Sequence, residues 1–131
     1  MADYTPVYST GQTPFPATTS ASVTGGTLAA WSGASTVATA GAASTVVCGV
    51  FAHDAASGAR VSVWPLDGVT HEIVAANNIT AGGGIQAAAS GQADPVATSI
   101  AAGSAAGTLI GTAETTVTAG GGAKVRFQGR H

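Results

Sequence analysis

The chain has 131 residues and a formal net charge of −2, and charged residues make up only 8% of it. Its four basic residues cannot cover a run of phosphates, which excludes nucleic-acid binding through clustered Lys and Arg. The single cysteine excludes an internal disulfide and a multi-cysteine metal site.

Small residues dominate the composition, with 29 Ala, 19 Gly, 18 Thr and 11 Ser, so the apolar core is small. Because the net charge is also low, we expect a compact domain rather than a disordered chain. Burial against copies of itself or a larger partner would add stability. The longest nearly apolar run, 46–52, is too short to span a bilayer, and the acidic start does not resemble a signal peptide. We therefore expect no membrane association and no export.

The first 24 residues hold three of the five prolines and three of the seven aromatic residues. Proline keeps the backbone extended, so no helix is expected here. Two interpretations stay open: a disordered terminus, or an extended arm that orders on a partner by adding a strand or inserting aromatic side chains. We expect an arm over 1–24, separable from a β domain over 25–131. The predicted binding residues of the arm are Tyr4, Pro6, Tyr8, Pro14 and Phe15.

Strands are indicated by alternating apolar and polar residues at 60–65, 69–74 and 124–128. The β-branched, nearly all-apolar segment 45–52 predicts the most buried strand. The Asp67-Gly68 turn signal predicts a hairpin over 59–75.

One helical candidate runs from Asp94, as the capping residue, to Ala106, with Pro95 in the first helical position.

Two stretches share an order of features that favours an internal duplication. Residues 25–33 align with 83–91, 48–52 with 110–113, and 58–63 with 122–127. A rival alignment pairs 79–84 with 117–122. The duplication would give two β units, 25–65 and 83–128, joined near 66–82. The predicted fold class is all-β, a small barrel or sandwich built from these units, with an extended N-terminal arm.

No complete catalytic or metal-binding pattern is present. His53-Asp54 and His71-Glu72 each lack the further ligands that a metal site needs, and Cys48 lies in an apolar setting typical of an inert thiol. The glycine triplets at 82–84 and 120–122 lack the Lys-Ser/Thr of a phosphate loop. We expect no enzymatic activity, cofactor or metal.

Trp64 shares one face of its predicted strand with Arg60. Two interpretations are open: the tryptophan is buried at a subunit contact, where this residue is enriched, or it covers one end of the barrel or sandwich.

The order of strands and glycines resembles a family of small capsid decoration proteins of tailed bacteriophages. The likeness covers residues 20–128. It rests on Gly-Thr-Leu from Gly26, the buried Val47-Cys48-Gly49-Val50 strand and Ala56-Ser57-Gly58-Ala59-Arg60-Val61-Ser62-Val63, with Gly111-Thr112-Ala113 and Gly121-Gly122-Ala123-Lys124-Val125-Arg126 near the end.

That resemblance implies a head-stabilising or cement protein, made in the host cytoplasm and bound to the outer surface of an icosahedral capsid. The implied partner is the major capsid protein, contacted through the arm, and the implied oligomer is a homotrimer. The alternative from another class is a module of a cell-surface adhesin or phage fibre, since such stalks are also rich in Thr, Ser, Ala and Gly.

Overall fold

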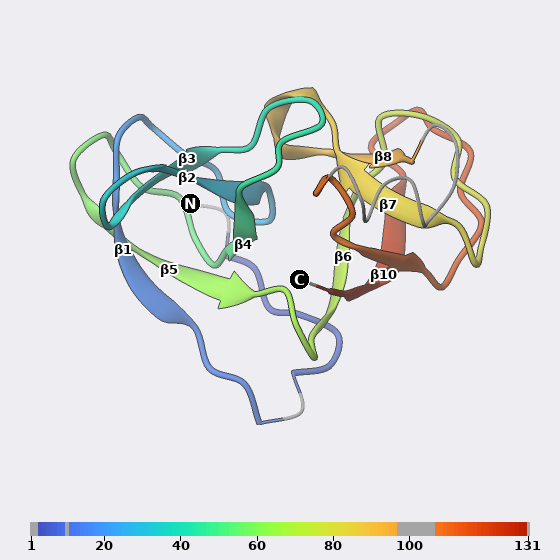
Figure 1. Ribbon diagram of the computed structural model, residues 1–131, viewed down its shortest axis with the longest axis horizontal. Helices are drawn as coiled ribbons and strands as arrows, with labels where there is room; N and C mark the ends of the chain where they lie inside the picture. Colours follow the sequence, from blue (N-terminus) through green and yellow to red (C-terminus); the bar gives the residue numbers. More distant parts are fainter. Residues whose placement is uncertain (1–2, 10, 97–106, 131) are drawn as a thin grey trace.

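The computed structural model describes residues 3–9, 11–96 and 107–130, and these form an all-β fold, as predicted (Figure 1). The first unit holds β1 (Phe15–Thr19), β2 (Leu28–Gly33), β3 (Thr36–Thr39), β4 (Val47–Phe51) and β5 (Arg60–Pro65). The second holds β6 (Thr70–Val74), β7 (Gly84–Ala87), β8 (Ala93–Pro95), β9 (Gly111–Ala113) and β10 (Lys124–Gly129), with a 3-10 turn at Ala89–Gly91. The two units lie side by side in Figure 1, the first on the left.

The first unit is a closed barrel with the strand order β1-β3-β2-β4-β5. Its pairings are antiparallel except for β1 with β3, which run parallel and join Thr19 to Val37. The barrel closes where β1 pairs with β5.

The second unit is a five-stranded sheet that repeats this strand order, and we call it the second barrel because one isolated bridge joins its two outer strands. Read from β1 in the other direction, the order of the closed first barrel is β1-β5-β4-β2-β3. The order of the second unit, β6-β10-β9-β7-β8, matches it, so β6, β10, β9, β7 and β8 correspond to β1, β5, β4, β2 and β3. An isolated parallel bridge between Ala75 and Ala93 joins its two edge strands, at the place where Thr19 meets Val37 in the first barrel. An antiparallel bridge from Val23 to Ala55 likewise recurs between Ile79 and Val117. The internal duplication predicted from sequence is therefore confirmed.

Equivalent hydrogen bonds fix the alignment of the two units. The amide of Phe51 donates to the carbonyl of Thr27, and the amide of Ala113 donates to the carbonyl of Gly83. Thr27, not Gly25, therefore corresponds to Gly83, a correction of two residues to the alignment of 25–33. The rival alignment is wrong, because Ile79 and Val117 are bridged to each other.

The later two alignments are confirmed by pairing, because Gly49 faces Pro65 as Gly111 faces Gly129. The first unit also starts earlier than expected, with β1 at Phe15, and it reaches the second through a shorter link than 66–82, since β6 starts at Thr70.

Each barrel has its own interior, and the positions match. Seven first-unit residues form one cluster: Ala17, Val23, Ala29, Val37, Phe51, Val61 and Val63. Their second-unit equivalents are all buried in the other cluster: Ile73, Ile79, Ile85, Ala93, Ala113, Val125 and Phe127. That cluster also takes in Leu28, Ala30, Ala40, Val47 and Val50 of the first unit, so one continuous core joins the units.

The segment predicted to be the most buried strand forms β4, in which Val47, Val50 and Phe51 are buried. The predicted hairpin over 59–75 is wrong in its pairing. A turn does lie at 67–68, but β5 pairs with β1 and β4, whereas β6 pairs with β10. The turn joins two barrels, so its strands have partners elsewhere.

The expected helix from Asp94 begins differently, because Ala93–Pro95 form β8 as the partner of β7; residues 97–106 of that prediction lie outside the described residues. Among the residues that the structure describes, no helix is long and apolar enough to cross a membrane.

Candidate interaction surface

The N-terminal segment at residues 3–8 runs under the junction of the two units (Figure 1). The amide of Tyr4 donates to the carbonyl of Ala52 in the first unit, at 2.7 Å. Farther on, Tyr8 and Thr70 form an antiparallel bridge on the second unit. The segment thus holds both barrels by backbone hydrogen bonds, like a short added strand on β6.

Tyr4 is anchored through its hydroxyl. That oxygen lies 2.8 Å from Nδ1 of His71 and accepts a hydrogen bond from the amide of Glu72 at 3.1 Å. On the other side of the imidazole, Nε2 lies 2.8 Å from the carbonyl of Pro65. A carbonyl only accepts, so Nε2 carries the proton and Nδ1 accepts from Tyr4. The Tyr4 ring also stacks on His71, with 5.8 Å between centroids.

Burial sets the ionisation of this chain of groups. It lowers the pKa of His71 to about 4, although the Pro65 carbonyl acts in the opposite direction, so the ring is neutral at pH 7. Burial also raises the pKa of the Tyr4 hydroxyl above its ordinary value, which keeps it protonated as a donor. Both groups are thus in the states that the hydrogen bonds require.

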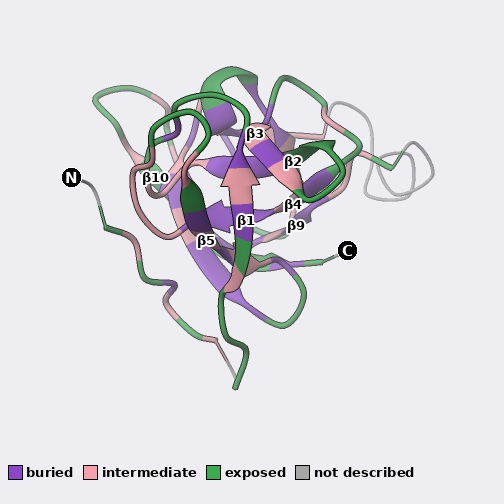
Figure 2. Cartoon of the chain, turned by 90° about the vertical axis from the view of Figure 1, so that its left-hand side faces the viewer, coloured by how far each residue is buried: buried purple, intermediate pink, exposed green. Residues whose placement is uncertain are grey.

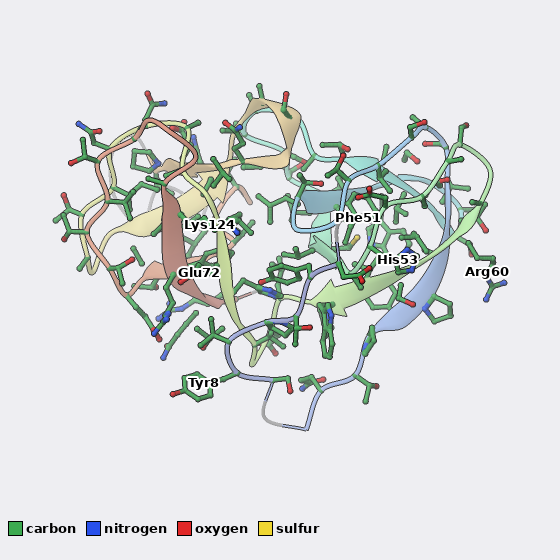
Figure 3. The ribbon with its side chains drawn as sticks, turned by 180° about the vertical axis from the view of Figure 1, so that it is seen from behind. Tyr8, Phe51, His53, Arg60, Glu72 and Lys124 are labelled. Atoms are coloured by element: carbon green, nitrogen blue, oxygen red, sulfur yellow. The ribbon has the colours of Figure 1, made fainter. Side chains whose placement is uncertain are left out.

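The predicted arm residues separate into two groups. Tyr4 is half-buried and Pro6 is buried against the protein's own barrels, whereas Tyr8 is 64% exposed and Pro14 is also exposed. Figure 3 shows Tyr8 projecting outward from the underside. Phe15 begins β1 and is half-buried. The structure therefore does not place these five residues on one free arm.

Phe15 stacks on Trp31, with 5.8 Å between ring centroids. Together with Cys48, Pro65, Leu66 and Asp67 they line a shallow hollow of about 250 Å³ at one end of the first barrel. Trp31 is 43% exposed. Beside it, Val46 accepts a backbone hydrogen bond from the Trp31 amide and is itself exposed. We call the four residues Phe15, Trp31, Cys48 and Pro65 the front end of the first unit.

The sequence alone assigns no role to Trp31 or Val46. The available signal was the rarity of tryptophan in a small-residue chain. Figure 2, which faces the first unit, shows exposed segments around β1, β2 and β5.

Trp64 and Arg60 lie on the outer side of β5, as the alternation predicted. Arg60 is exposed and Trp64 half-buried. Figure 3 shows Arg60 at the outer edge of the first unit, with its second-unit equivalent, Lys124, on the other barrel. A subunit contact through these two residues stays a prediction.

The residues weighed for chemistry have structural partners. His53 Nδ1 lies 2.9 Å from the carbonyl of Asp54, whose carboxylate accepts from the amide of Gly25. Burial raises the pKa of the Cys48 thiol to about 12, and the thiol points to the carbonyl of Ala29 at 3.6 Å. Within the described ranges, no three His, Cys, Asp or Glu residues gather as a metal site.

Comparison of the sequence with models of known families finds no match, and comparison with curated proteins finds none. Among solved structures, the chain is similar to the head fiber gp8.5 N base of bacteriophage phi29, with a TM-score of 0.64 and 19% identity. The likeness covers 91% of this chain and 94% of that one. At this identity it shows a shared fold.

Proposed function

We propose that this protein is a structural component of a bacteriophage virion, located on the outer surface of the head and without enzymatic activity. The observation that carries the proposal is the likeness to a phage head fiber base, which extends over nearly the whole of both chains. The resemblance of strand and glycine order to capsid decoration proteins supports the same assignment. The proposed partner is the major capsid protein.

Two forms of this role remain in competition. A decoration protein would stabilise the shell, as the sequence resemblance implies. A fibre base would attach a longer structure to the head, and the coverage of 94% of the gp8.5 N base chain favours this form. Attachment to the capsid is common to both, so it is the function that we propose.

The exposed part of the N-terminal segment is the proposed capsid contact. Tyr4 and Pro6 fix its path on the two barrels, which leaves the Tyr8 ring projecting outward. Because the segment is already ordered, binding through Tyr8 avoids much of the entropy cost of ordering a free arm. Pro14, exposed just before β1, extends the same contact.

Cosedimentation with phage heads that lack the protein tests this contact. We expect Tyr8→Ala to weaken binding by about tenfold or more, as for an aromatic hot spot. Val46→Ala is the matched control, since it shortens another exposed apolar side chain away from the segment. If Tyr8→Ala binds heads as tightly as the wild type, this contact is refuted. If the wild-type protein binds no head, the proposed function itself fails.

A further inference from the structure

The duplication shows how one of these barrels binds another. The four front-end positions of the first unit, Phe15, Trp31, Cys48 and Pro65, correspond in the second unit to His71, Ala87, Ile110 and Gly129. All four second-unit residues are buried. The same end of the same fold is therefore covered in one unit and open in the other.

Most of the cover on the second unit comes from the first unit. The carbonyl of Ala87 accepts from the amide of Ala43, and the amide of Gly91 donates to the carbonyl of Ala40. Gly91 also lies so close to Leu28 and Thr39 that a Cβ atom there would come within 2.9 Å of them. Tyr4 and the link residue Leu66 complete the cover over His71 and Gly129.

The covering surface of the first unit is apolar. We call it the back face, and it consists of Leu28, Ala30, Ala40, Val47 and Val50, all buried in the shared core. Within one chain, the back face of the first unit therefore packs against the front end of the second unit. Among the residues that the structure describes, such a head-to-tail contact leaves the front end of the first unit and the back face of the second unit uncovered.

Both unused surfaces are on the described part of the protein. The free front end is the mainly apolar hollow of about 250 Å³, which Leu66 and Asp67 also line and in which Trp31 is exposed. The free back face belongs to the second unit, where Gln86, Val96, Leu109 and Thr112 take the places of Ala30, Ala40, Val47 and Val50. These four residues are partly exposed, whereas their first-unit equivalents are buried. The fifth equivalent, Gly84 in the place of Leu28, is buried, and so is the Thr112 hydroxyl oxygen.

We propose that a second copy of this chain docks on the front end of the first unit through the back face of its own second unit. The contact repeats the one that already joins the two units of each chain. It is heterologous, so it produces a closed ring if the rotation closes and a filament if it does not. This interface rests on the duplication and is independent of the proposed place on a phage head.

Two variants block one surface each. Trp31→Lys removes the exposed aromatic ring from the front-end hollow and places a charge there, beside Asp67. Gln86→Lys places one on the back face, where the cross-strand neighbour Asp94 provides an opposite charge that favours folding. Ser57→Lys is the control, an exposed residue of the first unit outside both surfaces.

Analytical ultracentrifugation over a wide concentration range gives the result. We expect self-association of the wild type and of Ser57→Lys, and at least about thirtyfold weaker self-association of either interface variant. Mixing Trp31→Lys with Gln86→Lys should restore one contact and give a one-to-one dimer, because each retains the surface that the other has lost.

Three results would overturn the interface: a wild type that stays monomeric at all concentrations, a Trp31→Lys protein that associates like the wild type, or a mixture of variants that forms no dimer. Circular dichroism checks that the variants are folded. Trp31→Ser replaces Trp31→Lys if that variant does not fold, and Leu109→Lys replaces Gln86→Lys.

Discussion

One buried histidine joins the N-terminal segment to both barrels. His71 donates from Nε2 to Pro65 at the end of the first unit and accepts at Nδ1 from Tyr4. Its first-unit equivalent is Phe15, which has a tryptophan as its aromatic neighbour instead. The same position therefore holds a histidine that binds the N-terminal segment in the second unit, and a phenylalanine that lines an exposed hollow in the first unit.

This histidine makes stability depend on pH in a defined window. Its pKa is lowered to about 4 in the folded protein from an ordinary value of 6.5, so the unfolded chain binds more protons between these values. The contribution of neutral His71 to the free energy of unfolding is complete above pH 6.5. It falls by on the order of 3 kcal/mol as the pH is lowered toward 4.

Urea unfolding at pH 7 and pH 4.5 measures that loss. His71→Phe, which copies the first unit, is the control for carboxylates that titrate in the same range. We expect the free energy of unfolding of the wild type to fall more steeply than that of the variant. An equal loss of unfolding free energy between pH 7 and pH 4.5 in the two proteins would show that His71 is not buried in its neutral form.

At the scale of elements, each barrel has a glycine where two paired strands approach each other closely. A Cβ atom on Gly49 would clash with the carbonyl oxygen of Trp64 and lie 2.8 Å from Val63. On Gly111 it would clash with the carbonyl oxygen of Gln128, the residue equivalent to Trp64, and lie 2.6 Å from Phe127. The same glycine is thus required twice for the same steric reason.

Gly49→Ala should lower the free energy of unfolding by about 3 kcal/mol, at the upper end of the range for overpacked cores. Gly41→Ala is the matched control, since nothing lies within 4 Å of a Cβ atom there, and its effect should stay within about 0.5 kcal/mol. Thermal or urea denaturation gives both values. A Gly49→Ala protein as stable as Gly41→Ala would contradict the close crossing of β4 and β5.

Local patterns predicted elements better than they predicted partners. Alternation located β5, β6 and β10 because one face of each strand is buried. The Asp67-Gly68 turn did not reveal that its strands belong to different barrels, since a turn signal carries no information on which neighbours each strand has. The assignment of Phe15 to an arm missed β1, because proline is compatible with the start of a strand as well as with an extended terminus, and only Thr18 and Thr19 of β1 pair with β3.

At the scale of the whole molecule, the order of the glycines made the duplication detectable in the sequence. Glycines persist where the backbone requires them: Gly26 and Gly82 both have positive φ angles, of 82° and 88°. The alignment slipped by two residues at 25–33 because Ala and Gly repeat too often there to fix a register. Exposure of Trp31 could not be predicted, since it depends on which surface of the first unit packs against the second unit, and that surface is the back face.

The proposed function makes the protein a component of a phage head. Quantitative mass spectrometry of gradient-purified virions, with tailless heads purified separately, tests it most directly. We predict that the protein is present in both in a fixed ratio to the major capsid protein, and that mild surface proteolysis removes it before the shell is cleaved. Its absence from purified heads, with the protein free in the lysate, would contradict the claim.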